Sequence, residues 1–320
     1  MSSNIRALTV KEFADRLTEL DSVAVATHIR PDGDTVGTSV AMCRILEVLG
    51  KDAVLLPADN IPERLRFLTD GVKIADSADG RSVVTCDVAS PAQLGELYER
   101  LPEIALSLDH HAVSKPFAPN LTIGDLSSAG EVLYLVLCEL IANGKAALTP
   151  EIAYPLYAAI SSDTGGFMYS SATPDTYRVA AALMECGIDY ADINHRLFNS
   201  KSENQIKAEG FVAANMQTDG NLSYAVITAS DRERLGITSE HFETAIDVVR
   251  ARLGTEIAFV LKELDGGKYR VSLRSIGFNV ASVAEKFSGG GHVRAAGCTV
   301  MAEAPEIAID MIKDAIKQKG

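Results

Sequence analysis

Aspartate and histidine side chains gather at four points of this 320-residue sequence. HIRPDGD (28–34) follows one apolar run, Asp87 follows a second, Asp109-His110-His111 follow a third, and Asp163 closes a helical pattern. Taken singly, each point has an ordinary explanation: a Pro-Asp-Gly turn, a helix cap, a histidine pair in a core or loop, and the end of a helix. Taken together, they offer the carboxylate oxygens and imidazole nitrogens that bind divalent cations.

The elements that carry these residues are predicted from alternating apolar runs and helical patterns. Strands are predicted at 22–27, 52–56, 82–87 and 104–109, with a helix over 35–49 closed by Gly50 and a helix led by Pro91. Continuous apolar strands separated by helices indicate a parallel sheet that is covered on both faces. The carboxyl ends of such strands meet at one edge, where ligands bind. We therefore expect the aspartates and histidines to converge.

Convergence would create an electrostatic problem that cations solve. Five carboxylates in one cleft cannot all stay ionised, because like charges raise one another's pKa. Two divalent ions would neutralise them, and mixed oxygen and imidazole ligands favour Mn²⁺ or Mg²⁺ over a thiolate zinc site. Such a pair could share a bridging carboxylate and activate a water for in-line attack on phosphorus.

The rest of the chain predicts a helical region and then a second, smaller α/β domain. Helical patterns run from about 127 to 209, followed by strands at 222–229, 256–264 and 269–275 and a closing helix near 304–318. The predicted domains are 1–190, a helical linker over 191–215, and 216–320. Between the last strand and the closing helix lies the glycine-rich GGGHVRAAG (289–297).

The glycine-rich segment and the arginine before it are candidates for binding phosphate. Gly289, Gly290 and Gly291 precede His292 and a predicted helix start at Ala295-Ala296. Backbone N–H groups of such a turn, with a helix N-terminus, would attract an anion, although a plain tight turn is the alternative. Arg274 ends the strand before it and could clamp a phosphate, although a strand-end arginine is more often simply solvated.

Composition excludes several classes of protein. The net charge is −13, of which −12 lies in residues 1–200, and this disfavours a partner that is a long nucleic-acid duplex. There is no tryptophan and only 6% aromatic residues; Tyr269, Phe278 and Phe287 could stack a base, but core packing is their more usual role. No apolar run is long enough for a membrane span, and no signal pattern opens the chain. Five scattered cysteines without a CxxC pair disfavour disulfides and fit a reducing cytoplasm.

In order, HIRPDGD, Asp87, the DHH triplet and SDTGG around Asp163 resemble the four motifs of the DHH phosphoesterase superfamily. GGGHVRAAG resembles the glycine-rich motif of the substrate-binding domain associated with that superfamily. The resemblance covers nearly the whole chain and is strongest to the oligoribonuclease and PAP phosphatase group, the nanoRNases. It implies a Mn²⁺-dependent hydrolase of very short oligoribonucleotides and of 3′-phosphoadenosine 5′-phosphate (pAp), with Mg²⁺ or Co²⁺ as alternative ions. A homodimer is common in relatives.

The resemblance also implies a role for each motif residue. One Mn²⁺ would be held by His28, Asp32 and a bridging Asp87, and the other by Asp34, Asp87, His110 and Asp163. His111 would face the substrate phosphate as a general acid or hydrogen-bond donor, with Asp109 orienting an imidazole. Arg274, the three glycines and His292 would bind another part of the substrate. After Asp163-Thr164-Gly165 some relatives carry a basic residue, whereas this chain has Gly166-Phe167-Met168.

Other functions compete with this one. A manganese inorganic pyrophosphatase shares the metal motifs but has a different C-terminal domain, so GGGHVRAAG argues against it. Linear or cyclic dinucleotides are related substrates. A non-catalytic dinucleotide-binding signalling protein would be favoured by loss of a metal ligand, yet every motif acid and both DHH histidines are present.

Overall fold

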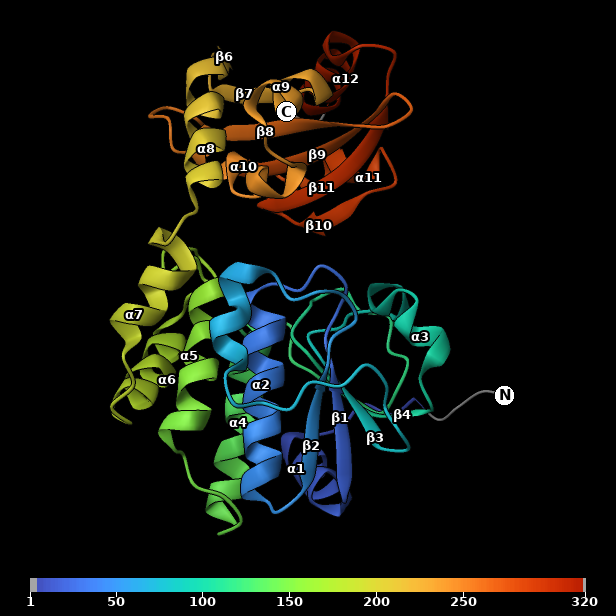
Figure 1. Cartoon of the computed structure of the whole chain (residues 1–320), viewed down its shortest axis with the longest axis vertical. Coiled ribbons are helices and arrows are strands. Elements are labelled where there is room, and N and C mark those ends of the chain that lie inside the picture. The colour runs from blue at the N-terminus through green and yellow to red at the C-terminus, as the bar shows by residue number, and fades with distance from the viewer. Residues whose placement is uncertain (1–4, 319–320) are drawn as a thin grey trace. The chain divides into compact units, whose positions relative to one another are not determined.

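The computed structural model describes residues 5–318 and divides the chain into two compact units, Met1–Ser200 and Lys201–Gly320 (Figure 1). Each unit has its own sheet and its own hydrophobic core. The division lies within the stretch predicted to be a helical linker, 191–215. There the structure has α7 (Tyr190–Asn194), the π-helical turn η3 (His195–Asn199) and α8 (Glu203–Asn215). The predicted domain limits stay predictions.

In the described part of the first unit, five parallel strands form one sheet in the order β2-β1-β3-β4-β5. The strands are β1 (Ser22–Ala26), β2 (Asp52–Leu56), β3 (Ser82–Cys86), β4 (Ile104–Asp109) and β5 (Asn120–Thr122). Nearly every residue of the first four is buried, as expected for parallel strands covered on both faces. The predicted parallel α/β fold is therefore confirmed. The sequence analysis did not predict β5, whose three residues are too few to show a pattern.

Helices pack unequally on the two faces of this sheet. Figure 1 shows α2, α4 and α5 side by side on one face, where Val25, Leu106 and Met42 belong to the main core. The opposite face has a smaller core that includes Ala24 and Leu94. The helices of this unit are α1 (Val10–Glu19), α2 (Gly33–Val48), α3 (Leu97–Arg100), α4 (Ala129–Ala142), α5 (Pro150–Asp163) and α6 (Pro174–Met184), with 3₁₀ turns η1 (Glu63–Thr69) and η2 (Pro91–Leu94).

The start of α2 places part of HIRPDGD inside the fold. Asp32 is the N-cap, and its Oδ1 accepts hydrogen bonds from the backbone N–H groups of Asp34 and Thr35, both at 3.1 Å. A Cβ on Gly33 would lie 2.6 Å from the Cβ of Ser162, so only glycine lets α2 approach α5 this closely. The helix begins two residues earlier than predicted, which buries Asp34 in its first turn.

The helix predicted from Pro91 is shorter than expected. It is the 3₁₀ turn η2, which ends at Gly95 with φ 55°, and the separate short helix α3 follows. A Cβ at Gly95 would lie 2.7 Å from Cγ2 of Ile29, in the loop that leads to α2. The glycine therefore interrupts the helix and allows a close approach to that loop.

The second unit contains a mixed sheet in the order β10-β11-β9-β8-β7-β6 among the described residues. Only β7 and β8 pair in parallel. Its strands are β6 (Gln217–Asp219), β7 (Leu222–Ile227), β8 (Ile257–Leu264), β9 (Lys268–Ser275), β10 (Gly290–His292) and β11 (Ala295–Met301). Its helices, besides α8, are α9 (Ala229–Leu235), α10 (Ala245–Arg250), α11 (Ala281–Glu285) and α12 (Pro305–Lys317), with the 3₁₀ turn η4 (Ser239–Phe242). A second, smaller α/β unit is thus confirmed.

The predicted helix start at Ala295-Ala296 is wrong, because these residues begin strand β11. Burial alternates along β11: Ala296, Cys298 and Val300 are buried, and the residues between them are exposed. The whole strand pairs antiparallel with β9, and this long-range partner overrides the weak local preference of small residues. The glycine cluster is therefore followed by strand β11 and not by the N-terminus of a helix. Tyr269, Phe278 and Phe287 pack in or against the core of this unit, as expected.

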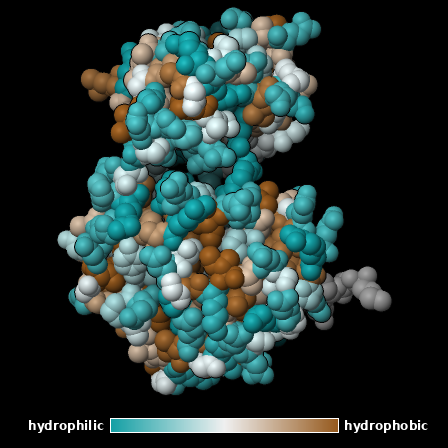
Figure 2. Space-filling view, in the orientation of Figure 1, coloured by the Kyte–Doolittle hydropathy of each residue, from teal (hydrophilic) through white to brown (hydrophobic). Residues whose placement is uncertain are grey.

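Within residues 5–318, no helix combines the length and apolarity needed to cross a membrane. Figure 2 shows hydrophilic residues over most of the visible face of each unit, with hydrophobic residues in small patches between them. Exposed apolar side chains such as Leu253 and Val113 lie far apart in the sequence.

Candidate active site

The predicted convergence of strand ends occurs in the first unit. β1, β3 and β4 are adjacent and parallel, so their carboxyl ends meet at one edge of the sheet. His28 lies two residues beyond β1, Asp87 directly follows β3, and Asp109 is the last residue of β4. Two helices complete the site, because Asp34 lies in the first turn of α2 and Asp163 is the last residue of α5.

All six predicted metal ligands belong to groups whose ligand atoms lie within 4.8 Å of one another. One group is His28, Asp32 and Asp87, a second is Asp34, His110 and Asp163, and a third is Asp87, His110 and His111. Asp87 and His110 each belong to two groups, so the three form one continuous cluster. The structure therefore brings these predicted residues together.

The distances within the cluster suit a central cation better than direct pairing. Nε2 of His110 lies 3.6 Å from Asp34 Oδ2, 3.6 Å from Asp87 Oδ1 and 3.5 Å from Asp163 Oδ2. These separations exceed the 2.7–3.2 Å of a good hydrogen bond. Neighbouring ligand atoms around a small octahedral ion are about 3 Å apart, which is close to what is seen here.

His28 and His110 present the same nitrogen to the carboxylates. Nδ1 of His28 lies 2.8 Å from the carbonyl oxygen of Ile29, and Nδ1 of His110 lies 3.3 Å from that of Leu126. A carbonyl oxygen can only accept, so each Nδ1 donates its proton, and Nε2 is turned to the carboxylates. Metal-binding histidines are commonly oriented in this way, by a hydrogen bond from the nitrogen that does not bind the ion.

Asp87 gives the clearest sign that this site fits a cation. Its side chain is only 4% exposed, and its buried Oδ1 has no hydrogen-bond partner among the described residues. Its backbone is left-handed, with φ 60°, which is strained for a residue other than glycine. A buried carboxylate oxygen that accepts no hydrogen bond, held by a strained backbone, is costly unless something positive binds it. The residues present therefore fit a divalent metal ion.

The charges of the cluster point to the same conclusion. Burial and the neighbouring Asp34 carboxylate raise the pKa of both Asp87 and Asp163 well above the usual value, and burial raises the pKa of Asp34. Burial alone would lower the pKa of His28, but Asp32 and Asp87 outweigh it and raise this pKa to about 11. Without a cation, Asp34, Asp87 and Asp163 therefore hold protons to higher pH than usual, whereas, despite burial, His28 lowers the pKa of Asp32 to about 2, and a bound cation would displace the protons.

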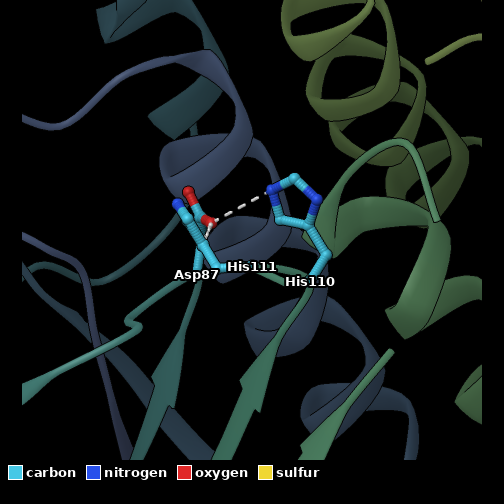
Figure 3. A group of neighbouring side chains, drawn as sticks. All are labelled: Asp87, His110 and His111. Carbon is cyan, nitrogen blue, oxygen red and sulfur yellow. Dashed lines mark ion pairs between the residues drawn. The ribbon is translucent and has the colours of Figure 1, made fainter. Parts of the chain in front are cut away.

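His111 is oriented by Asp109. Nδ1 of His111 lies 2.7 Å from Asp109 Oδ1, and the backbone N–H of His111 donates to the same oxygen at 3.3 Å. Figure 3 shows Asp87 with dashed lines from its carboxylate to the rings of His110 and His111; the His111 Nδ1 is 3.5 Å from Asp87 Oδ1. Asp109 is 1% exposed, so this arrangement is set inside the fold.

The predicted substrate-binding residues lie together in the second unit. Arg274 on β9 is paired with Ala295 on β11, which is in turn paired with His292 on β10. A Cβ on Gly289 would lie 2.3 Å from the carbonyl oxygen of Gly297, and Gly291 has φ 140°. These glycines therefore allow the tight packing of the β10–β11 hairpin. Arg274 also lines a surface hollow of about 280 Å³, with residues of α10 and β8.

Comparison with known proteins identifies the family. A model of the DHH family N-terminal domain matches residues 22–160, and a DHHA1 domain model matches residues 219–318. A Thermus thermophilus protein named bifunctional oligoribonuclease and PAP phosphatase NrnA is 30% identical, over 93% of this chain and 90% of its own. The chain belongs to the DHH family.

Other relatives support membership of this phosphoesterase family. The Bacillus subtilis protein of the same name is 26% identical, over 91% of this chain and 94% of its own. A crystal structure of an exopolyphosphatase-related protein from Bacteroides fragilis has the same fold, with a TM-score of 0.86 at 21% identity and coverage of 97% and 95% of the two chains. The resemblance read from the motifs is confirmed, and enzymes of this family depend on metal ions.

Sequence reasoning missed the residues that hold Asp34 in this DHH protein. Asp34 accepts hydrogen bonds from the hydroxyl of Thr38 and from the backbone N–H groups of Ala129 and Gly130. One signal was available, because Ser128 followed three residues later by Glu131 is the pattern that begins a helix. The pattern predicts where α4 starts, but not that this start meets Asp34.

Proposed function

We propose that this chain is a Mn²⁺-dependent phosphoesterase that hydrolyses very short oligoribonucleotides and removes a phosphate from pAp. The observation that carries the proposal is the cluster around Asp87, whose buried Oδ1 accepts no hydrogen bond from the described residues. The chain that carries this cluster is similar, over 93% of its length, to a relative whose name gives these two activities.

The proposed ligands divide between two ions. His28, Asp32 and Asp87 would hold one ion, and Asp34, His110 and Asp163, together with Asp87, would hold the other. Cys86 is next to Asp87, but burial raises the pKa of its thiol well above the usual value, so no thiolate is offered. Oxygen and imidazole ligands without thiolate favour Mn²⁺ or Mg²⁺. When bound, the ions would stabilise charge on the phosphate and lower the pKa of the attacking water.

His111 is the proposed proton donor. Its Nδ1 is engaged with Asp109, so Nε2 is the nitrogen that could reach the phosphate. Hydrolysis breaks a P–O ester bond, and the sugar oxygen that leaves must gain a proton. A protonated His111 could give that proton, and the Asp109 carboxylate would stabilise the positive imidazolium that precedes the transfer.

The second unit would bind another phosphate of the same substrate. Arg274 and His292 are a charged and a polar side chain next to the glycine hairpin, and backbone N–H groups there could donate hydrogen bonds to an anion. Long single strands require extended basic grooves with aromatic platforms. The net charge of −13 and the absence of tryptophan fit a short substrate instead.

Two measurements test this function. Purified protein with Mn²⁺ is offered pAp, a diribonucleotide, pyrophosphate and a long single strand, and turnover of the first two is expected to dominate. Turnover of pyrophosphate alone, or binding without turnover, would contradict the proposal.

The variant Arg274→Ala should raise KM by about 10- to 100-fold, the value of a charged hydrogen bond of roughly 1.5–3 kcal/mol. Arg270→Ala is the matched control, because Arg270 is exposed on the same strand. Equal effects in the two variants would remove Arg274 from the proposed site.

A further inference from the structure

Glu131 is a buried carboxylate outside the proposed metal and proton-transfer residues, and it is 2% exposed. We infer that Glu131 is a positioning residue: it fixes the first turn of α4 against Asp34 and thereby sets the affinity of the site for divalent cations. The inference rests on the proposed function, because it treats Asp34 as a metal ligand. Three hydrogen-bonded links connect Glu131 to Asp34 and to the helices around it.

The first link joins α4 to Asp34. Oδ1 of Asp34 accepts from the Thr38 hydroxyl at 3.0 Å and from the N–H of Gly130 at 3.1 Å, and Oδ2 accepts from the N–H of Ala129 at 2.8 Å. A carboxylate oxygen has about two good acceptor directions. Both directions of Oδ1 are therefore used, and Oδ2, 3.6 Å from Nε2 of His110, is the oxygen left to bind an ion.

The second link closes the turn that carries these two N–H groups. Oε2 of Glu131 accepts from the N–H of Ser127 at 3.0 Å and from its hydroxyl at 2.7 Å. In return, the N–H of Glu131 donates to Oγ of Ser128, the N-cap, at 3.1 Å. Ala129 and Gly130 lie inside this closed turn, so their N–H groups have a fixed direction.

The third link ties the turn to α6. The hydroxyl of Thr176, which is fully buried, donates to Oε2 of Glu131 at 3.2 Å. Oγ1 of Thr176 also accepts from the N–H of Thr173, the N-cap of α6. The start of α4 is thereby connected to the start of α6 through one carboxylate.

Packing against α5 leaves the turn little freedom to find another position. A Cβ on Gly130 would lie 2.7 Å from the Cβ of Ala159 and 3.4 Å from Oγ1 of Thr38. Backbones this close cannot shift toward α5, so loss of the Glu131 bonds would move the turn away from Asp34. The ligand oxygen would then lose its orientation while the ligands themselves remain.

Glu131 could act through its negative charge instead of its hydrogen bonds. Substitution by glutamine distinguishes these two explanations. Ser127 N, Ser127 Oγ and Thr176 Oγ1 all donate to Oε2. A glutamine can place its carbonyl oxygen there for the two bonds from Ser127, and its amide nitrogen, at the position of Oε1 3.4 Å from Thr176 Oγ1, can donate to that hydroxyl, so the links remain without the charge. If Glu131 acts through its hydrogen bonds, Glu131→Gln should therefore keep the Mn²⁺ affinity that Glu131→Ala loses.

The experiment measures Mn²⁺ binding by titration calorimetry, without substrate, on the full chain. Glu131→Ala should weaken binding of Mn²⁺ by about 10- to 100-fold, the usual effect of removing a group that orients a ligand. Glu131→Gln should stay within about threefold of wild type. Leu137→Ala is the matched control: Leu137 lies in the same helix, seven residues beyond Gly130, and is fully buried in the main core, so the substitution should lower the melting temperature but leave Mn²⁺ affinity unchanged.

Each outcome is decisive. Equal weakening in Glu131→Ala and Leu137→Ala would overturn the inference in favour of general destabilisation, and equal weakening in Glu131→Gln would overturn it in favour of charge. Should Glu131→Ala fail to fold, Thr176→Val removes the third link, together with the acceptor of the Thr173 N–H, and leaves both Ser127 bonds of Glu131 in place; it should still weaken Mn²⁺ binding severalfold, whereas no change would count against the inference. Wild-type protein that binds no Mn²⁺ would overturn the proposed function as well, which distinguishes the two failures.

Discussion

Asp87→Asn should have two opposite effects on stability: the metal-free protein becomes more stable at high pH, and stabilisation by Mn²⁺ disappears. The substitution keeps the shape of the side chain and removes only its charge. Asparagine also tolerates the left-handed backbone at this position, where φ is 60°. The prediction therefore isolates the electrostatic role of one carboxylate.

The sign of the first effect follows from the raised pKa of Asp87. Burial and the nearby Asp34 outweigh the attraction of His28, so the folded protein keeps a proton on Asp87 at pH values where the unfolded chain has lost it. Stability of the metal-free protein therefore falls as pH rises above about 4, the usual pKa of an aspartate. Asparagine has no proton to lose, so the advantage of the variant should appear above that pH and grow with pH until Asp87 ionises in the folded state.

The size of the second effect follows from binding linkage. Mn²⁺ at 100 times its dissociation constant stabilises a protein by about 2.7 kcal/mol. For a unit of about 200 residues, each kcal/mol raises the melting temperature by about 2–4 °C, which gives about 5–11 °C for the wild type. The variant should show little of this increase, because Asp87 belongs to two of the three ligand groups.

Thermal unfolding followed by circular dichroism, at several pH values and with or without Mn²⁺, measures both effects. Asp125→Asn is the control, since Asp125 is an exposed carboxylate in the same unit and should change neither. Two results would refute the reasoning: a metal-free variant no more stable than wild type at pH 8, or a variant that Mn²⁺ still stabilises by the wild-type amount.

Two further predictions concern the same site. His111→Ala should lower kcat by about 10²- to 10⁴-fold while calorimetry still detects the wild-type number of Mn²⁺ ions; loss of an ion would instead make His111 a ligand, in the group it forms with Asp87 and His110. The dissociation constant of Mn²⁺ should fall as pH rises above about 4, the usual pKa of an aspartate, by up to about tenfold per pH unit for each proton displaced, because Asp87 and Asp163 hold protons at higher pH than usual. Calorimetry in buffers of different ionisation enthalpy counts those protons, and an affinity independent of pH would contradict the raised pKa values.

The sequence was sufficient for the elements that depend on local patterns. Continuous apolar runs such as 82–86 have one physical outcome, a strand buried on both faces, and the acids and histidines beyond those runs had to follow the strands to one edge of the sheet. That is why the convergence of these residues could be predicted from the strands, whereas the role of each residue came from the resemblance to the DHH motifs. The motif order then pointed to the family, because each motif carries part of the same site.

Tertiary structure alone decided whatever depends on a partner distant in the sequence. Ala295-Ala296 suits a helix start locally, yet pairing with β9 makes it a strand. Asp34 and Gly130 are 96 positions apart, and no local pattern states that the start of α4 donates to that carboxylate. The buried Oδ1 of Asp87, which accepts no hydrogen bond from the described residues, and the turn closed by Glu131 likewise exist only once the helices have packed. The sequence thus determines which residues could bind a metal. Their orientation is set by packing between helices and strands that are distant in the sequence.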